Sequence, residues 1–313
     1  MSYAIQPNET VEQAAKRIAT EQVDKAVDEL CDESIDRHEA VHQARKRFKK
    51  IRGAVRLFRG AMDEEYGSEN QWFRDLGREL SRVRDAEARI EALDALGETF
   101  ADQVEEGAFE SVREALVERR DEVAGEIVDL DARVAEVAEQ LRSAKERIRN
   151  WRLDAEGFEA VEDGLTRTYR RGRKALAAAY EEPNDEAFHE WRKRVKYHWY
   201  HTRLLRHVWP PMMKVRRRCL KQLGSLLGDD HDLLLLRQTV TESPERYGDP
   251  RELQALLALA QRRQGELRAK AHPLGVHVYA EEDKCFGRRI EAHWRAWSEA
   301  TSLTPLQAGP EAA

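Results

Sequence analysis

The chain has 313 residues, of which 36% are charged, while proline (9 residues) and glycine (17 residues) are scarce. This composition is typical of an all-α protein and argues against a β-sandwich or an α/β fold. Residues 1–25 contain no apolar signal segment, and no run approaches 18 apolar residues, so we expect a cytoplasmic protein without a membrane span. The three cysteines form no CxxC pair, which predicts reduced, buried thiols and neither a zinc site nor a disulfide framework.

The formal net charge of −6 is distributed unevenly along the chain. Residues 37–59 contain nine Lys and Arg against one acid, and residues 189–221 contain eleven against one. These windows carry +8 and +10, which leaves −24 for the remainder. An acidic exterior around two basic segments favours a localised, inward-facing anion site over a broad surface for duplex DNA.

Helices are predicted along both halves of the chain. In the first half we expect helices over 10–31, 35–62 and 70–96, then a long helical hairpin over 100–150, with Asn8 or Thr10 as the first N-cap. In the second half we expect helices over 158–180 and 186–209, a stop at Pro210-Pro211, and further helices over 213–239 and from 251 onward. Residues 304–313 are expected to form a disordered tail.

A stripe of basic residues occurs twice, 147 residues apart. The first consists of His42, Arg45, Lys49, Arg52, Arg56 and Arg59, and the second of His189, Arg192, Lys196, Arg203 and Arg206. The spacings of three and four place each set on one helix face, beside an apolar face that can pack. The same offset aligns Leu76-Gly77 with Leu223-Gly224 and Asp85 with Asp232, which indicates a duplicated unit. We therefore predict a first repeat over 1–150 and a second over 151–303, together forming one domain.

These motifs resemble those of the CHAD family, α-helical domains named for their histidines. The resemblance spans nearly the whole chain and rests on four segments, namely Val41-His42-Gln43-Ala44-Arg45, Phe188-His189-Glu190-Trp191-Arg192-Lys193, Leu80-Ser81-Arg82-Val83-Arg84-Asp85 and Leu227-Gly228-Asp229-Asp230-His231-Asp232. It implies two pseudo-two-fold-related four-helix bundles with a basic groove between them. It further implies binding of inorganic polyphosphate in that groove, without catalysis by the domain itself. We also expect association with polyphosphate granules, and neither a cofactor nor a metal.

Polyphosphate has regularly spaced negative charges and no bases to read, so two rows of Arg and Lys suit it, with Arg making bidentate contacts. The candidate binding residues are His42, Arg45, Lys46, Lys49, Lys50, Arg52, Arg56, His189, Arg192, Lys193, Lys196, Arg203 and Arg206. Candidates that would extend the channel are Arg170, Arg171, Lys174, Arg217 and Lys221. Tyr197 and Trp199 occupy positions that are usually basic in the family, which predicts a locally weaker second row carried by Arg203 and Arg206. The chain length leaves no room for the triphosphate-processing domain often fused to such domains, so we expect a stand-alone binder.

Several alternatives remain open from the sequence. Single-stranded RNA is a rival ligand, because it could stack on Trp191, Tyr197, Trp199, Tyr200 and Trp209. The acidic helices over 105–136 could instead serve as a scaffold for a protein partner. His42 and His189 could donate to phosphate, pack in the core or bind a metal, and the His231-Asp232 pair invites the metal interpretation as well. Asp85 and Asp232 could also orient neighbouring Arg or Lys side chains.

Overall fold

The protein is all-α, as its composition predicts. The computed structural model describes residues 3–62, 65–80, 82–105, 107–126 and 130–303, without the side chains of 82–85, 124–126 and 303, and this part of the chain contains no strand. The helices in chain order are α1 (Val11–Cys31), α2 (Arg37–Leu57), α3 (Glu65–Glu79), α4 (Arg82–Thr99), α5 (Glu110–Glu126), α6 (Leu130–Arg149), α7 (Glu159–Glu181), α8 (Asp185–Leu204), α9 (Pro210–Glu242), the 3-10 helix η1 (Pro244–Arg246), α10 (Pro250–Val278) and α11 (Asp283–Leu303).

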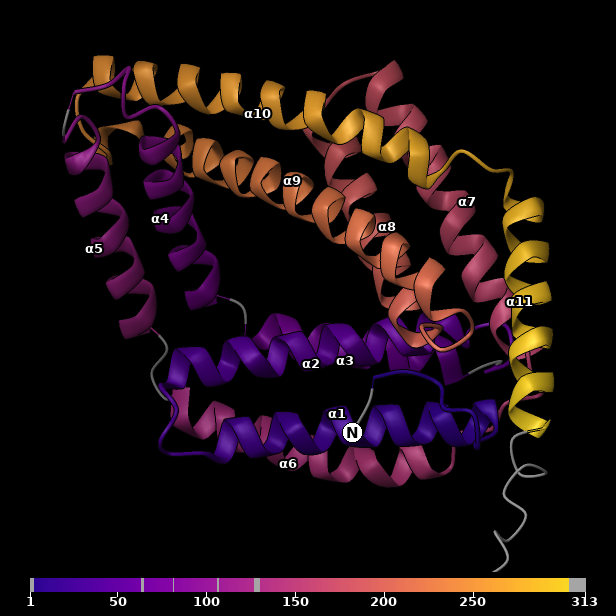
Figure 1. The fold of residues 1–313 in the computed structure, drawn as a ribbon. Coiled ribbons are helices and arrows are strands. Elements are labelled where there is room, and N and C mark those ends of the chain that lie inside the picture. Colours follow the sequence, from indigo (N-terminus) through magenta and orange to yellow (C-terminus); the bar gives the residue numbers. More distant parts are fainter. Residues whose placement is uncertain (1–2, 63–64, 81, 106, 127–129, 304–313) are drawn as a thin grey trace, which may run out of the picture.

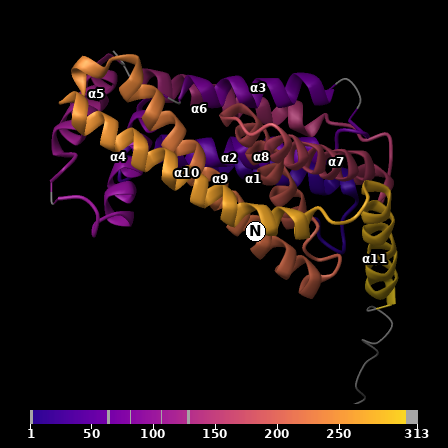
Figure 2. The same cartoon turned by 90° about the horizontal axis from the view of Figure 1, so that it is seen from above.

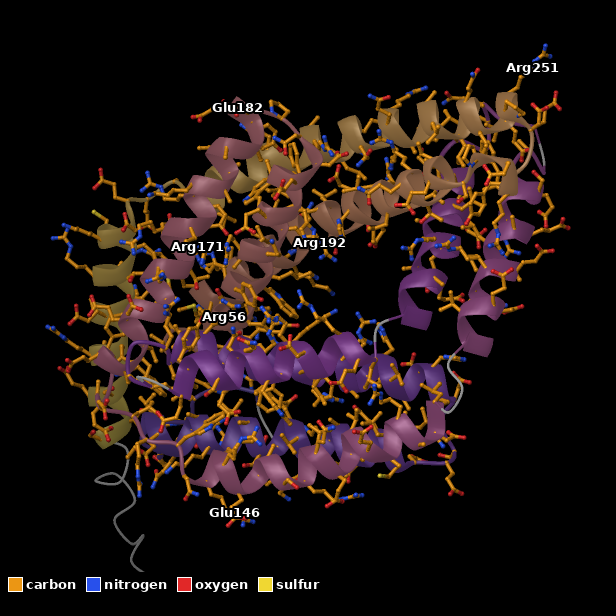
Figure 3. All side chains as sticks on the ribbon, turned by 180° about the vertical axis from the view of Figure 1, so that it is seen from behind. Arg56, Glu146, Arg171, Glu182, Arg192 and Arg251 are labelled. Atoms are coloured by element: carbon orange, nitrogen blue, oxygen red, sulfur yellow. The ribbon has the colours of Figure 1, made fainter. Side chains whose placement is uncertain are left out.

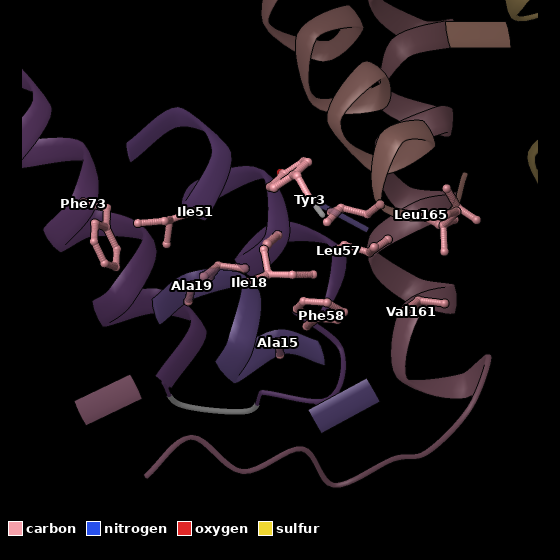
Figure 4. Packing of buried hydrophobic residues seen from close by; sticks show 14 of the residues in the cluster. Tyr3, Ala15, Ile18, Ala19, Ile51, Leu57, Phe58, Phe73, Val161 and Leu165 are labelled. Carbon is pink, nitrogen blue, oxygen red and sulfur yellow. The ribbon is translucent and has the colours of Figure 1, made fainter. Parts of the chain in front are cut away.

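Two layers of helices make up most of the molecule (Figures 1 and 2). In the first layer α1 packs against both α2 and α6, and α2 packs against α3. In the second layer α8 packs against α7 and α9, and α9 against α10, while α11 packs against α7. A large core joins the first layer to α7 and α8 through apolar side chains such as Ile18, Leu57, Phe58, Val161 and Leu165 (Figure 4).

The α4–α5 pair connects the two layers at the end opposite α11 (Figure 1). α4 packs against α5 and also against α9. A second apolar cluster buries Leu93 and Leu96 of α4 and Leu116 of α5 together with Leu236 of α9 and Leu256 of α10. Helices from the first half of the sequence therefore complete a core that belongs to the second half.

Several predicted boundaries are confirmed and others are wrong. Thr10 caps α1 through a capping box with Gln13, as the sequence predicts. The single helix predicted over 70–96 is instead α3 and α4, because α3 packs in the first layer on α2 whereas α4 turns to pack on α9. Pro210 and Pro211 do not stop a helix but begin α9, since the first turn of a helix needs no proline N–H.

The hairpin predicted over 100–150 is also wrong. α5 and α6 are both helical, but α5 packs against α4 and α6 against α1. α2 ends at Leu57 rather than near 62, because the chain turns at Phe58–Ala61. The predicted tail over 304–313 lies outside the described residues.

The packing order of the helices is the same in both halves. Shifted by 147 residues, α1 and α2 coincide with α7 and α8, and α3 and α4 coincide with successive parts of the continuous α9. The contacts of α1 with α2 and α6 then correspond to those of α7 with α8 and α11. This order is consistent with a duplication, while the division near residue 150 stays a prediction.

No helix in the described part of the chain has the length and apolar character that a membrane crossing requires.

All three cysteines are free, but Cys31 and Cys285 are exposed, so the expectation that the thiols are buried is wrong for these two. Both lie at or near helix ends on the surface, which the spacing of cysteines in the sequence could not reveal.

Candidate functional site

The two basic stripes lie on α2 and α8, which touch each other, except that Arg59 and Arg206 follow the last residues of these helices. The two helices come close together at Gly53, where a Cβ would lie 2.8 Å from the Cβ of Tyr200. From this contact α8 rises away from α2, and its first turn is fixed to α10 by an ion pair of 2.5 Å between Asp185 and Arg268. Arg56 and Arg192, one from each helix, lie at the junction of the two layers (Figure 3).

On α2, Arg52 and Arg56 surround an aromatic side chain of α8. Arg52 donates a hydrogen bond of 3.3 Å to the hydroxyl of Tyr197 and one of 3.4 Å to the side-chain oxygen of Asn70. The guanidinium of Arg56 lies 4.1 Å from the centre of the Tyr197 ring. Both arginines are thus held by neutral groups, and burial lowers the pKa of Arg52.

On α8, Arg192 and Lys196 lie one turn apart and are half-buried. Burial lowers the pKa of both side chains, and in Lys196 the nearby charge of Arg192 lowers it further. The Nε atoms of Arg192 and Arg56 are buried and have no hydrogen-bond partner in the part of the chain that the structure describes. Such groups are costly to leave unsatisfied, so a ligand that accepts hydrogen bonds at this site would be stabilised.

On the other flank of the α2–α8 contact, Lys50 and Arg203 are neighbours. The guanidinium of Arg203 lies 4.6 Å from the centre of the Trp199 ring and 5.0 Å from that of Tyr3. Burial, together with the charges of Arg47 and Arg203, lowers the pKa of Lys50 to about 8. Burial first, and the neighbouring positive charges second, therefore oppose protonation of this lysine.

Five of these side chains, which we call the five cations, are Arg52, Arg56, Arg192, Lys196 and Arg203. Within the described residues, none of the five forms an ion pair with a carboxylate. Other half-buried arginines do, as Arg17 does with Glu9 (2.6 Å) and Arg289 with Glu281 (2.6 Å). Asp229 and Asp232 favour the charged forms of Arg192 and Lys196, but only through electrostatic interactions. Half-buried charge that is not paired directly is unfavourable, so the site is suited to a multivalent anion.

His189 does not point alone into the site but pairs with a second histidine. Its Nδ1 lies 3.2 Å from Nδ1 of His231, so one ring must donate and the other accept. Burial lowers the pKa of His189, and burial plus the charge of Arg192 lowers that of His231 to about 3. Within the described residues no third metal-binding side chain converges on this pair.

The remaining predicted residues have varied surroundings. His42, Arg45 and Lys49 lie on α2 and each has a polar or charged partner. Lys46 is exposed, and Lys193 forms an ion pair of 2.5 Å with Glu190. Arg206 donates a hydrogen bond of 3.2 Å to the ring of His207. Burial lowers the pKa of Arg206, and the nearby charge of Arg217 lowers it further. The side chains of Arg84 and Asp85, and Ser81, lie outside the described residues.

The predicted channel extensions differ among themselves. Arg171 of α7 forms an ion pair of 3.6 Å with Glu190. Burial lowers the pKa of Arg171, and the charge of Arg56 contributes to the same shift. Arg170 points elsewhere, toward Asp283 of α11 at 3.6 Å. Lys174 and Lys221 are exposed, whereas Arg217 lies near Arg203 and Arg206.

The sequence did not identify Tyr3 or Arg216 as part of the site, and it did not predict that aromatic side chains contact the basic residues. Arg216 of α9 donates hydrogen bonds to Nε2 of the buried His198 on α8, at 3.2 Å, and to the carbonyl of Val278 on α10, at 2.9 Å. It therefore connects α8 to α10. Tyr197 and Trp199 were expected to weaken the second row, yet their rings hold Arg56 and Arg203. Helical spacing would have marked the aromatic positions beside the stripe, but not their partners across the helix contact.

Comparison with known proteins places the chain in a family. The sequence model of the CHAD domain matches residues 14–241. The chain belongs to the CHAD family. A solved structure described as PptA from Streptomyces chartreusis superimposes with a TM-score of 0.61 at 15% identity, covering 87% of this chain and 100% of that one. At that identity the likeness shows the fold alone, and no curated protein matches the sequence.

The CHAD match covers α2, α8 and almost all of α9, and therefore all of the five cations. Residues 3–13, α10 and α11 lie outside it. The N-terminal segment and the last two helices are thus parts of this chain that the family match does not describe, although both contact the CHAD helices.

Proposed function

We propose that this CHAD protein binds inorganic polyphosphate between α2 and α8 without cleaving it. The observation that carries the proposal is the set of five half-buried cations that form no ion pair with a carboxylate among the described residues. The predicted binding residues on α2 and α8, with Arg171 of α7 and Arg217 of α9 beside them, would contact successive phosphates. Membership of the family supports the same ligand class.

The chemistry of the ligand matches the site. Each internal phosphate carries about one negative charge, and a guanidinium can donate two parallel hydrogen bonds to its oxygens. In a partly desolvated site these contacts are stronger than in water, because the effective dielectric constant is lower. Bound polyphosphate would also relieve the mutual repulsion of the cations.

Binding without cleavage fits the side chains at the site. Phosphoryl transfer usually needs a metal or an activated nucleophile near the reacting phosphate. Tyr, Trp and Asn side chains surround Arg52, Arg56 and Arg203. The carboxylates that act on Arg192 and Lys196, Asp229 and Asp232, belong to no group of three or more metal-binding side chains within the described residues. We further propose that the protein acts in the cytoplasm, where it would associate with polyphosphate granules.

A salt titration tests the proposal. Binding of long-chain polyphosphate is measured over a range of ionic strengths, with single-stranded RNA of matched charge as competitor. We expect affinity to fall steeply and log-linearly with salt, because polyphosphate would release its counterions on binding, as other polyanions do. RNA should compete poorly, since the faces of Tyr197 and Trp199 are occupied by Arg56 and Arg203.

The matched control is Arg133→Gln with Arg142→Gln, two exposed arginines of α6 that pair with glutamates. This variant changes the net charge but should leave the salt dependence unchanged. Equal competition by RNA would make the site a general polyanion groove. Absence of binding to either polymer would refute the proposal and favour the acidic helices as a protein scaffold.

A further inference from the structure

The N-terminal strap, residues 3–9, crosses the contact between α2 and α8. The hydroxyl of Tyr3 donates a hydrogen bond of 2.8 Å to the carbonyl of Lys50 on α2. The amide of Ile5 donates one of 2.9 Å to the carbonyl of Leu204 on α8. Tyr3, Ala4 and Ile5 are all buried, so the strap joins the two helices that carry the basic stripes.

The strap is itself fixed to α1. Arg17 donates to the carbonyl of Ala4 at 2.8 Å and pairs with Glu9 at 2.6 Å, at the two ends of the strap. Tyr3 also packs edge-on against Tyr200, with ring centres 6.1 Å apart, next to Gly53. These contacts hold the Tyr3 ring in one place relative to α8.

The Tyr3 ring and the Trp199 ring together position the guanidinium of Arg203, at 5.0 Å and 4.6 Å from their centres. A carboxylate would occupy the N–H groups of an arginine, because it binds their edge. An aromatic ring instead contacts the planar face and leaves the N–H edge able to donate to another group. Aromatic contacts thus fix an arginine without consuming its capacity to bind phosphate.

We propose that Tyr3 is a positioning residue, which holds Arg203 in the orientation that binds a phosphate group. This inference rests on the proposed function of the α2–α8 site. By this inference the N-terminal strap, which lies outside the region matched by the family model, contributes to the binding site. Preorganisation of Arg203 lowers the conformational entropy lost when the ligand binds.

A double-mutant cycle on polyphosphate affinity tests the role. Tyr3→Leu removes the ring and should weaken binding about fivefold, the size of a partly desolvated cation–π contact. Tyr3→Phe keeps the ring and should stay within about twofold of the wild type. In an Arg203→Ala background, Tyr3→Leu should have no further effect, because the side chain that it positions is gone.

Controls separate positioning from folding. Phe100→Leu removes a buried ring under another arginine, Arg262, at 5.1 Å in the second core. It should lower the melting temperature as Tyr3→Leu does, yet leave affinity unchanged. Because Tyr3 is buried, Trp199→Leu is taken through the same cycle, and it should show the same dependence on Arg203.

The outcomes distinguish the inference from the function. If the wild type binds polyphosphate but Tyr3→Leu and Trp199→Leu weaken binding equally with and without Arg203, the positioning role is wrong while the function stands. If Arg203→Ala binds like the wild type, the inference is likewise overturned. If the wild type does not bind polyphosphate, the proposed function fails and the inference fails with it.

Discussion

Arginine side chains in this protein are held either by carboxylates or by aromatic rings, and the kind of partner decides whether the guanidinium can bind another anion. Arg268 is held by Asp230 at 2.6 Å and Asp185 at 2.5 Å, which neutralise its charge. Arg56 and Arg203 are held mainly by aromatic rings, which do not neutralise the charge of the guanidinium. The first kind of contact fixes α8 and α9 to α10, and the second leaves positive charge available between α2 and α8.

Lys50 should make the affinity for polyphosphate dependent on pH. Its pKa is about 8 in the free protein, so its cationic form is lost as the pH rises through that value. A bound polyanion favours the cation, so binding above about pH 8 must take up a proton, and affinity should fall by up to about tenfold per pH unit. Binding isotherms between about pH 7 and pH 9 check this prediction.

The matched pair for this measurement is Lys50→Arg and Lys145→Arg. Lys50→Arg keeps a charge over the whole range and should flatten the dependence. Lys145, which pairs with Asp24 at 2.6 Å, lies away from the site, and its replacement should change nothing. A wild-type affinity that stays constant up to pH 9 would contradict the prediction.

His201 should make the fold sensitive to mild acid. It is fully buried, and burial together with the charge of Arg56 lowers its pKa from 6.5 to about 3. The unfolded chain therefore binds a proton that the folded chain does not. Stability is fully present above about pH 6.5 and is lost as the pH falls toward 3, by about 2 kcal/mol at about pH 5.

Urea unfolding at several pH values measures this effect. His201→Gln should unfold with a shallower pH dependence than the wild type between about pH 6.5 and pH 5, whatever its absolute stability. Parallel curves for the two proteins would show that His201 does not contribute.

Among the elements, the α2–α8 contact depends on a glycine. Alanine at position 53 would place its Cβ 2.8 Å from the Tyr200 Cβ and 3.0 Å from the Tyr3 hydroxyl, so the helices would have to separate. Although Ala favours a helix over Gly by about 1 kcal/mol, overpacking costs about 1–3 kcal/mol. Gly53→Ala should therefore destabilise the protein and weaken polyphosphate binding, because both basic stripes shift.

The control is Gly97→Ala on α4, where nothing lies within 4 Å of the added Cβ. That change should stabilise the protein by about 0.5–1 kcal/mol and leave affinity unchanged. Thermal unfolding and binding of both variants decide the matter. An unaltered or more stable Gly53→Ala protein would mean that the helices do not need this close approach.

The sequence predicted elements better than their arrangement. Apolar and basic periodicities located α1 and α7 closely, because these helices are amphipathic. They also located the starts of α2 and α8, but the predictions ran five residues past the observed ends at Leu57 and Leu204. The break between α3 and α4 was missed, since residues 78–83 contain neither glycine nor proline and only the change of packing partner ends α3.

The candidate site was predicted in part for the same reason. Helical spacing placed both stripes on α2 and α8. It could not show that Lys193 pairs with Glu190 while Lys196 does not pair with a carboxylate, nor that Tyr3 lies across from Arg203. Those facts depend on contacts between residues far apart in the chain.

At the scale of the molecule, the two sequence halves share a core. Ile90, Leu93, Leu96 and Leu116 of α4 and α5 are buried against α9 and α10. A fragment of residues 1–150 would expose these side chains to water. We expect the fragment to be unstable and prone to association alone, because several leucine-sized groups would lose about 1.5–3 kcal/mol each.

Co-expression measures this dependence. The fragment 1–150 should become monodisperse when residues 151–313 are produced with it, and the pair should recover the circular dichroism of the intact chain. A fragment that folds cooperatively by itself, with the melting temperature of the whole protein, would show that the halves are independent.

The most direct test of polyphosphate binding between α2 and α8 is calorimetric titration of long-chain polyphosphate into two proteins. One is the wild type, and the other carries Arg52→Gln, Arg56→Gln, Arg192→Gln and Lys196→Gln, which leave the ion pairs of the fold intact. We predict salt-sensitive binding to the wild type and a loss of at least about a hundredfold in the variant, since several charge-assisted contacts disappear together. Equal affinity in a folded variant would contradict the account, because the ligand would then bind elsewhere.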